Sequence, residues 1–162
     1  MLNPLPPILH SLRALSRILA KTESNLAQRK IAPATILTDR LYPDMFPFAR
    51  QVQLATDHAK AIGARLAGVD APTFEEGEPD FASLTARIET VVAFLSAIPE
   101  EAFSGAEEKA LVIKAGPREL NFTGTQYLDY FAVPNFYFHM TTAYNILRHN
   151  GVEIGKADFL GG

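Results

Sequence analysis

The chain has 162 residues, of which 48% are hydrophobic and 20% charged, and its formal net charge is −3 at pH 7. We expect residues 1–162 to form a single globular domain that binds neither nucleic acid nor acidic lipid, because both of those partners require a basic surface. The chain contains no cysteine, which excludes disulfides, thiolate metal sites and a cysteine nucleophile and favours a cytoplasmic location.

The first predicted helix runs from about Leu5 to Gln28, with apolar residues at helical spacing and two prolines that its first turn tolerates. His10, Arg13 and Arg17 interrupt the apolar run, so we predict neither a signal peptide nor a membrane-spanning segment. A short helical turn is expected at Pro33–Leu37.

A second helix is predicted from about Phe46 to Leu66, with Asp44 as its N-terminal signal and Gly68 after its end. Gln51 and His58 lie two turns apart on or beside its apolar stripe. The segment 70–80 is predicted to be a polar loop, and its acidic residues are interpreted as solvated charges: Glu75, Glu76 and Glu78.

A third helix is predicted from about Phe81 to Ala97, and Pro99 ends it. Apolar residues then alternate with polar ones around Gly116-Pro117, which predicts a β-hairpin with its turn at 115–118. An isolated hairpin is only marginally stable in water, so we expect it to pack on the helices or on a partner chain.

The last predicted helix runs from about Gly124 to Asn150, and Pro134 should kink or divide it. Arg148 and His149 in the last turn, followed by Gly151, mark its end. The tail is expected to dock through Phe159 and Leu160. Together these elements predict an all-α protein, a four-helix bundle with a small β-hairpin inserted before the last helix.

Polar side chains interrupt the apolar faces of the second and fourth helices. His139 lies in an aromatic segment, with Asn135 one turn before it, and His58 occupies a matching place on the second helix. A buried titratable group costs energy unless it is hydrogen-bonded, so these positions predict a small polar cavity between the two helices. Its predicted lining consists of Gln51, His58, Asn135, His139 and Tyr144.

The same histidines also suggest a metal site, in which His58 and His139 would be ligands. A catalytic zinc site needs three protein ligands, and the residue one turn after His139 is Ala143. A third ligand would have to come from Asp44, Asp57 or another helix. Histidine can also act as a general acid or base without a metal, although no Ser-His-Asp or paired-carboxylate spacing is visible.

Three segments resemble a known family: LYPDMFPFARQVQLATDHAK, the FTG before the last helix, and FAVPNFYFHMTTAYNILRHNGVEIGKADFLG. They are similar to a bacterial branch of the DinB/YfiT-like superfamily, a domain of unknown function. The resemblance implies a DinB-like bundle, a homodimer, and descent from metalloenzymes that hold a divalent metal with three histidines, some of which are thiol-dependent transferases. His58 matches the second-helix ligand and His139 one fourth-helix ligand, whereas Ala143 stands where the other would be.

Three functional hypotheses follow. The first is a protein that binds a small molecule at a degenerate, metal-free site between the second and fourth helices. The second is a non-enzymatic structural or interaction homodimer whose interface is built from the aromatic stretch and the hairpin. The third is a hydrolase or thiol transferase in which His58 and His139 hold a divalent metal and a bound water reacts.

Overall fold

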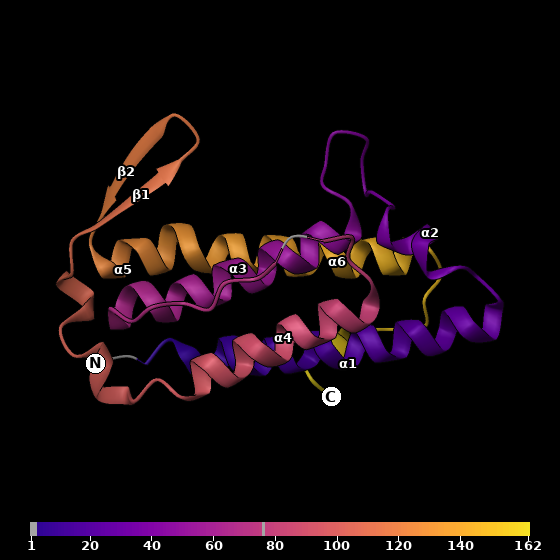
Figure 1. Ribbon diagram of the computed structural model, residues 1–162, viewed down its shortest axis with the longest axis horizontal. Helices are drawn as coiled ribbons and strands as arrows, with labels where there is room; N and C mark the ends of the chain where they lie inside the picture. Colours follow the sequence, from indigo (N-terminus) through magenta and orange to yellow (C-terminus); the bar gives the residue numbers. More distant parts are fainter. Residues whose placement is uncertain (1–2, 76) are drawn as a thin grey trace.

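The computed structural model describes residues 3–75 and 77–162, so Glu76 lies outside the described residues. Four long helices form a bundle: α1 (Leu5–Arg29), α3 (Phe48–Ala67), α4 (Phe81–Ser96) and α6 (Val133–His149) (Figure 1). The predicted all-α bundle with a small hairpin before the last long helix is therefore confirmed. Within the described ranges, no single helix combines the length and the apolar character needed to cross a membrane.

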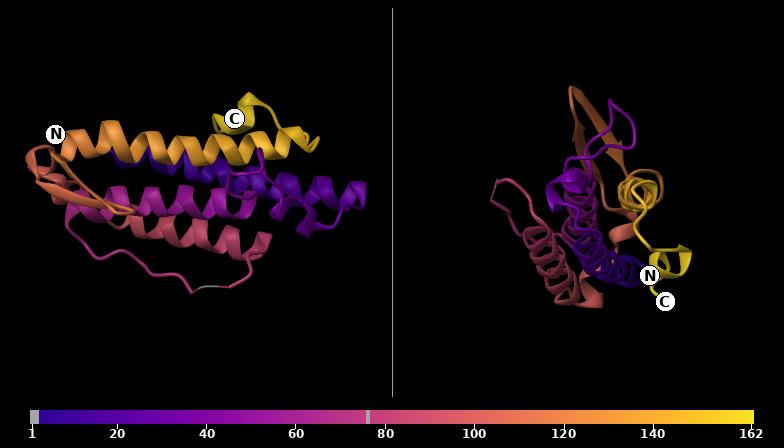
Figure 2. Two further views of the ribbon diagram at one scale, coloured as in Figure 1. Left: turned by 90° about the horizontal axis from the view of Figure 1, so that it is seen from above. Right: turned by 90° about the vertical axis from the view of Figure 1, so that its right-hand side faces the viewer.

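The helices do not simply alternate in direction. α1 and α6 run one way along the bundle and α3 and α4 run the other way, so the connector 68–80 has to return along its length (Figures 1 and 2). Phe74 ties this connector to both helices, because the Arg87 guanidinium lies 3.9 Å and the Lys60 ammonium 4.8 Å from its ring centroid. This long crossover connection allows the consecutive helices α3 and α4 to pack in parallel.

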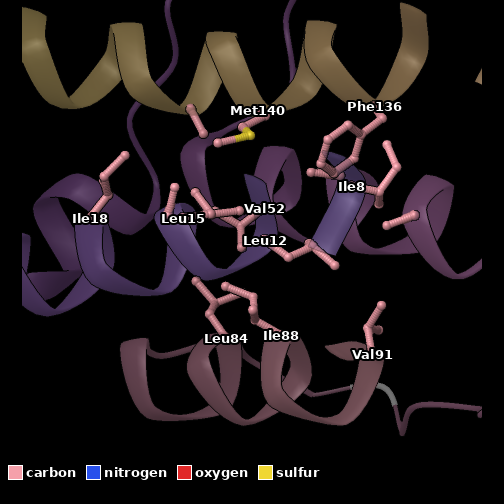
Figure 3. Close-up of a cluster of buried hydrophobic side chains, with 14 of the residues drawn as sticks. Ile8, Leu12, Leu15, Ile18, Val52, Leu84, Ile88, Val91, Phe136 and Met140 are labelled. Carbon is pink, nitrogen blue, oxygen red and sulfur yellow. The ribbon is translucent and has the colours of Figure 1, made fainter. Parts of the chain in front are cut away.

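The core lies between the four long helices (Figure 3). Each contributes a stripe of aliphatic or aromatic side chains at helical spacing, and these side chains are almost completely buried. Typical members are Ile8, Leu12, Leu15, Ile18, Val52, Leu84, Ile88, Val91, Phe136 and Met140.

The second long helix begins later than the sequence predicts. α3 starts at Phe48 after Pro47, no side chain caps it, and Asp44 lies exposed in the preceding loop, so the N-terminal signal assigned to Asp44 is wrong. The first N–H of the helix is satisfied by a backbone group and needs no side-chain cap. The Phe48 N–H donates to the Asp39 backbone carbonyl at 2.8 Å, across the 38–47 loop. The predicted short turn before the loop is present as α2 (Pro33–Leu37).

The hairpin is formed by β1 (Leu111–Ala115) and β2 (Arg118–Phe122), with Leu111 opposite Phe122. Its predicted turn at 115–118 is confirmed. Two short 3₁₀ helices precede it, η1 (Glu100–Phe103) and η2 (Ala106–Glu108), which the sequence pattern does not predict because they are too short to show a period.

The chain after the hairpin forms one helical path in three pieces. α5 (Gly124–Tyr127) passes into a π-helical segment, η3 (Leu128–Ala132), and then into α6. Pro134 lies in the first turn of α6, so its missing N–H coincides with a change of helix type. The predicted division at Pro134 is confirmed, and so is the helix end, where Gly151 follows with φ +76°.

The tail docks on α1 through a last short helix, α7 (Lys156–Phe159). The Phe159 ring packs edge-on against Tyr144 at 5.6 Å, whereas the Leu160 side chain stays exposed. The Leu160 carbonyl instead accepts a hydrogen bond from the His10 Nε2 at 2.8 Å. The expected docking therefore uses the side chain of Phe159 and the backbone of Leu160.

Gly124 allows α5 to lie against η2 at a distance that no other residue would permit. A Cβ at this position would lie 1.7 Å from the Ala106 carbonyl oxygen, which is a backbone atom and cannot rotate away. We predict that Gly124→Ala lowers the free energy of unfolding by more than about 2 kcal/mol in chemical denaturation.

Gly155→Ala provides the matched control, since a Cβ there meets nothing within 4 Å. Its effect should stay within about 0.5 kcal/mol. Equal, small effects of the two substitutions would show that the contact between α5 and η2 is not a constraint on the fold.

Candidate functional site

Three of the five predicted site residues meet between α3 and α6. The Gln51 Oε1 lies 2.7 Å from the His139 Nδ1. The His58 ring stacks on the His139 ring, with centroids 5.5 Å apart and planes 13° from parallel. Gln51 is 1% and His139 9% exposed, while His58 is half-buried. The site is thus a stacked pair of imidazoles, one of which is hydrogen-bonded to a buried amide.

The buried amide sets the tautomer of His139. The Gln51 Nε2 donates to the Phe46 carbonyl at 3.0 Å, so the Gln51 Oε1 faces the imidazole. An amide oxygen can only accept a hydrogen bond, and therefore the His139 Nδ1 carries the proton. In the neutral ring the Nε2 is then a hydrogen-bond acceptor.

This acceptor has no protein partner among the described residues. Gln51 is the only described group that bonds to His139, and it uses the Nδ1. No buried side-chain nitrogen or oxygen of the described residues lacks a partner, so the unpaired Nε2 must still reach solvent. The two ring nitrogens of His58 also have no hydrogen-bond partner among the described residues and reach solvent. The half-buried His58 ring contacts the rings of Phe131 and His139.

Aromatic rings border the two imidazoles. The Phe131 ring approaches His58 edge-on at 6.1 Å, and the Phe138 ring approaches His139 edge-on at 5.3 Å. The sequence pattern assigns these phenylalanines only to the core or an interface. The sequence does indicate the place of Phe131. It precedes His139 by about two helical turns and so lies near the same side of the helix.

Both histidines are less basic than usual. Burial, together with the smaller effects of positive charge on His58 and Arg50, lowers the pKa of His139 to about 4. Burial also lowers the pKa of His58; the Asp57 carboxylate opposes this shift, and Arg65 adds to it. Near neutral pH the site therefore holds two uncharged imidazoles.

The other two predicted residues make their contacts elsewhere. The Asn135 side chain donates from Nδ2 to the Phe131 carbonyl at 2.6 Å, one turn back along its own helix. The Phe131 carbonyl lies within the π-helical segment η3. Tyr144 packs on Phe159 of the tail. Neither residue shares a described contact with the histidine pair.

The side chains around the pair do not supply a three-ligand metal site. No group of three or more histidine, cysteine, aspartate or glutamate side chains within the described ranges could hold an ion. Ala143 is buried, Asp44 is exposed in the 38–47 loop, and the Asp57 carboxylate binds Arg87 at 2.6 Å and Lys60 at 3.3 Å. Two imidazoles alone do not fit the three-histidine arrangement of the wider superfamily.

The histidine pair reaches solvent at the contact between α3 and α6. Five pockets on the described residues are lined by other side chains. Phe138, whose ring lies edge-on to His139, is 56% exposed, so the border of the pair faces solvent on this side.

The fold and this site define a DinB-like four-helix-bundle protein. The crystal structure of a DinB family member from Shewanella denitrificans is similar to it over 96% of this chain and 88% of that chain, with a TM-score of 0.89 and 39% sequence identity. The family model Domain of unknown function (DUF1993) matches residues 4–160. The chain belongs to this family, and the resemblance noted in the sequence is confirmed. Comparison with curated proteins gives no match.

The low pKa of His139 makes the stability of the protein depend on pH. Because the ordinary pKa is 6.5 and the folded value is about 4, the unfolded chain binds the proton first as the pH falls. Stability is lost through this window, and we expect His139 to account for about 2 kcal/mol between pH 7 and pH 5.

Chemical denaturation of the protein and of His139→Asn at the two pH values tests this. An asparagine amide can still donate to Gln51 from the place of Nδ1 but does not titrate. The variant should therefore lose less stability on acidification. An equal loss in both proteins, or a His139 ring that titrates near pH 6.5 by NMR, would contradict the prediction.

Proposed function

We propose that this protein binds a small molecule with an apolar body and one O–H or N–H group at the Gln51–His58–His139 site. The observation that supports this most directly is the His139 Nε2, an acceptor without a partner in the described protein, on a residue that is only 9% exposed. Leaving such an acceptor poorly solvated costs free energy, and a hydrogen-bond donor on a ligand would remove that cost.

The surroundings of the pair indicate what kind of molecule would fit. Two uncharged imidazoles offer hydrogen bonds but no strong ionic attraction, so a neutral donor suits them better than an anion. Phe131 and Phe138 offer ring edges and faces for an apolar or aromatic body. Hydrogen bonds to the imidazoles and contacts with the phenylalanine rings would hold such a molecule without a metal.

Phenol is a suitable probe, because it joins one O–H donor to one aromatic ring. We predict that phenol shifts the NMR signals of the His58 and His139 rings, with a Kd on the order of 1 mM. Anisole has the same ring without the donor and should bind about tenfold more weakly, because one hydrogen bond to a buried acceptor is lost.

Two variants make the test specific. His139→Asn keeps the bond to Gln51 but removes the Nε2 acceptor, so it should reduce phenol binding to the level of anisole. His149→Asn lies on the same helix, in the exposed last turn of α6, and should leave phenol binding unchanged. Equal affinities for phenol and anisole, or unchanged binding in His139→Asn, would refute the proposed function.

A second candidate function is a homodimer, and a separate observation favours it. The 38–47 loop and the hairpin project from the same side of the bundle (Figures 1 and 2). Large apolar side chains are exposed on these projections and on η3 and α6: Tyr42 (65%), Phe46 (54%), Val112 (57%), Tyr130 (77%) and Phe138 (56%). A second copy of the chain would cover this apolar surface and brace the hairpin.

The dimer is tested by light scattering over a range of concentrations. We predict a mass that rises toward twice 17.8 kDa and a double variant, Tyr130→Glu with Phe138→Glu, that stays at the monomer mass. Leu160→Glu places the same charge on an exposed apolar residue of the tail and should leave the dimer intact. A monomer mass for the unaltered protein throughout the micromolar range would exclude the dimer.

A further inference from the structure

An apolar pocket is lined by residues from the start of α1, the end of α3, the 3₁₀ helices and the helical path that begins with α5. Figure 1 shows these elements together at one end of the bundle. The volume of the pocket is about 210 Å³, and Leu66, Phe103 and Leu128 form much of its wall. Phe103 is 1% and Leu66 5% exposed, so these walls are anchored in the core. None of the residues of the histidine pair lines this pocket.

Two local features of the sequence position one wall of the pocket. Gly124 brings the start of α5 against the Ala106 carbonyl, and both residues line the pocket. Thr123 and Gln126 form a capping box that holds this first turn: the Gln126 N–H donates to the Thr123 Oγ1 at 3.3 Å, and the Thr123 N–H donates to the Gln126 Oε1 at 3.0 Å. The FTG segment thus shapes one side of the pocket.

The size of the pocket suits a compact organic group. An apolar cavity of roughly 150 Å³ in another protein holds benzene. A space of about 210 Å³ can therefore take one six-membered ring with a short substituent. Because the pocket is open to solvent at one side, a polar substituent can remain at its mouth.

Two carboxylates give this apolar pocket a charge preference. Glu107 and Asp129 line it, and neither carboxylate takes part in an ion pair or a hydrogen bond found within the described residues; the Glu107 backbone carbonyl accepts from the Thr125 Oγ1 at 3.4 Å. The neighbouring Lys109 ammonium is engaged by the Arg65 carbonyl at 2.8 Å and the Leu66 carbonyl at 3.4 Å at the end of α3. A cation at the pocket would therefore meet two carboxylates that have no other described partner.

We propose that this pocket binds a small organic ammonium ion, with its apolar body against Leu66, Phe103 and Leu128 and its charged group beside Glu107 and Asp129. Apolar burial would supply most of the affinity, and the carboxylates would select a cation over neutral or acidic molecules of the same shape. This site is independent of the histidine pair, so either can exist without the other.

Benzylammonium tests the proposal, with benzyl alcohol as its neutral counterpart of nearly the same shape. We expect benzylammonium to shift backbone NMR signals within 103–107 and 124–129, and benzyl alcohol to bind about tenfold more weakly. Glu107→Gln combined with Asp129→Asn should abolish this difference. Glu89→Gln, an exposed carboxylate on α4, is the matched control and should preserve it.

Thr125→Trp provides a blocking variant, because Thr125 is an exposed residue at the lining and a large ring there can cover the pocket without disturbing the core. It should eliminate benzylammonium binding while the unfolding midpoint is unchanged. The proposal is overturned if no signals shift up to about 10 mM benzylammonium. It is equally overturned if benzyl alcohol binds as tightly, or if binding survives in a folded Thr125→Trp protein.

Discussion

The packing of α3 against α6 is the contact on which the candidate site depends. It brings residues 88 positions apart in the chain, Gln51 and His139, within hydrogen-bonding distance. It also stacks His58 on His139, burying His139 and half-burying His58. The uncharged state of the pair and its aromatic border both depend on this one helix–helix contact.

Much of the bundle could be predicted because its long helices carry strong local signals. The stripe from Ile8 to Leu26, the proline after Ile98 and the glycine at 151 act within a few residues of where they appear. The start of α3 was predicted wrongly because a backbone carbonyl of Asp39, and not a side chain, satisfies its first N–H. The two 3₁₀ helices were missed because such short turns depend on the elements that they join.

Sequence patterns also predicted part of the candidate site, whereas other parts depend on tertiary contacts. Polar residues on apolar helix faces indicated Gln51, His58 and His139, which the structure brings together. Asn135 satisfies the same pattern, yet its side chain bonds to the Phe131 carbonyl of its own helical path. The tautomer of His139 depends on the Phe46 carbonyl, which lies outside any helix, so no periodic pattern could have indicated it.

The crossover between α3 and α4 has a consequence for how the chain acquires its structure. Because these helices run in parallel, α1 finds its main partner in α4 and α3 finds its main partner in α6, so most interhelical contacts join segments far apart in the chain. Chains rich in such distant contacts fold more slowly than bundles whose successive helices pair as hairpins. During synthesis, the part of α3 that packs on α6 therefore remains uncovered until the hairpin and α6 have followed it, and in this interval the nascent protein is exposed to aggregation.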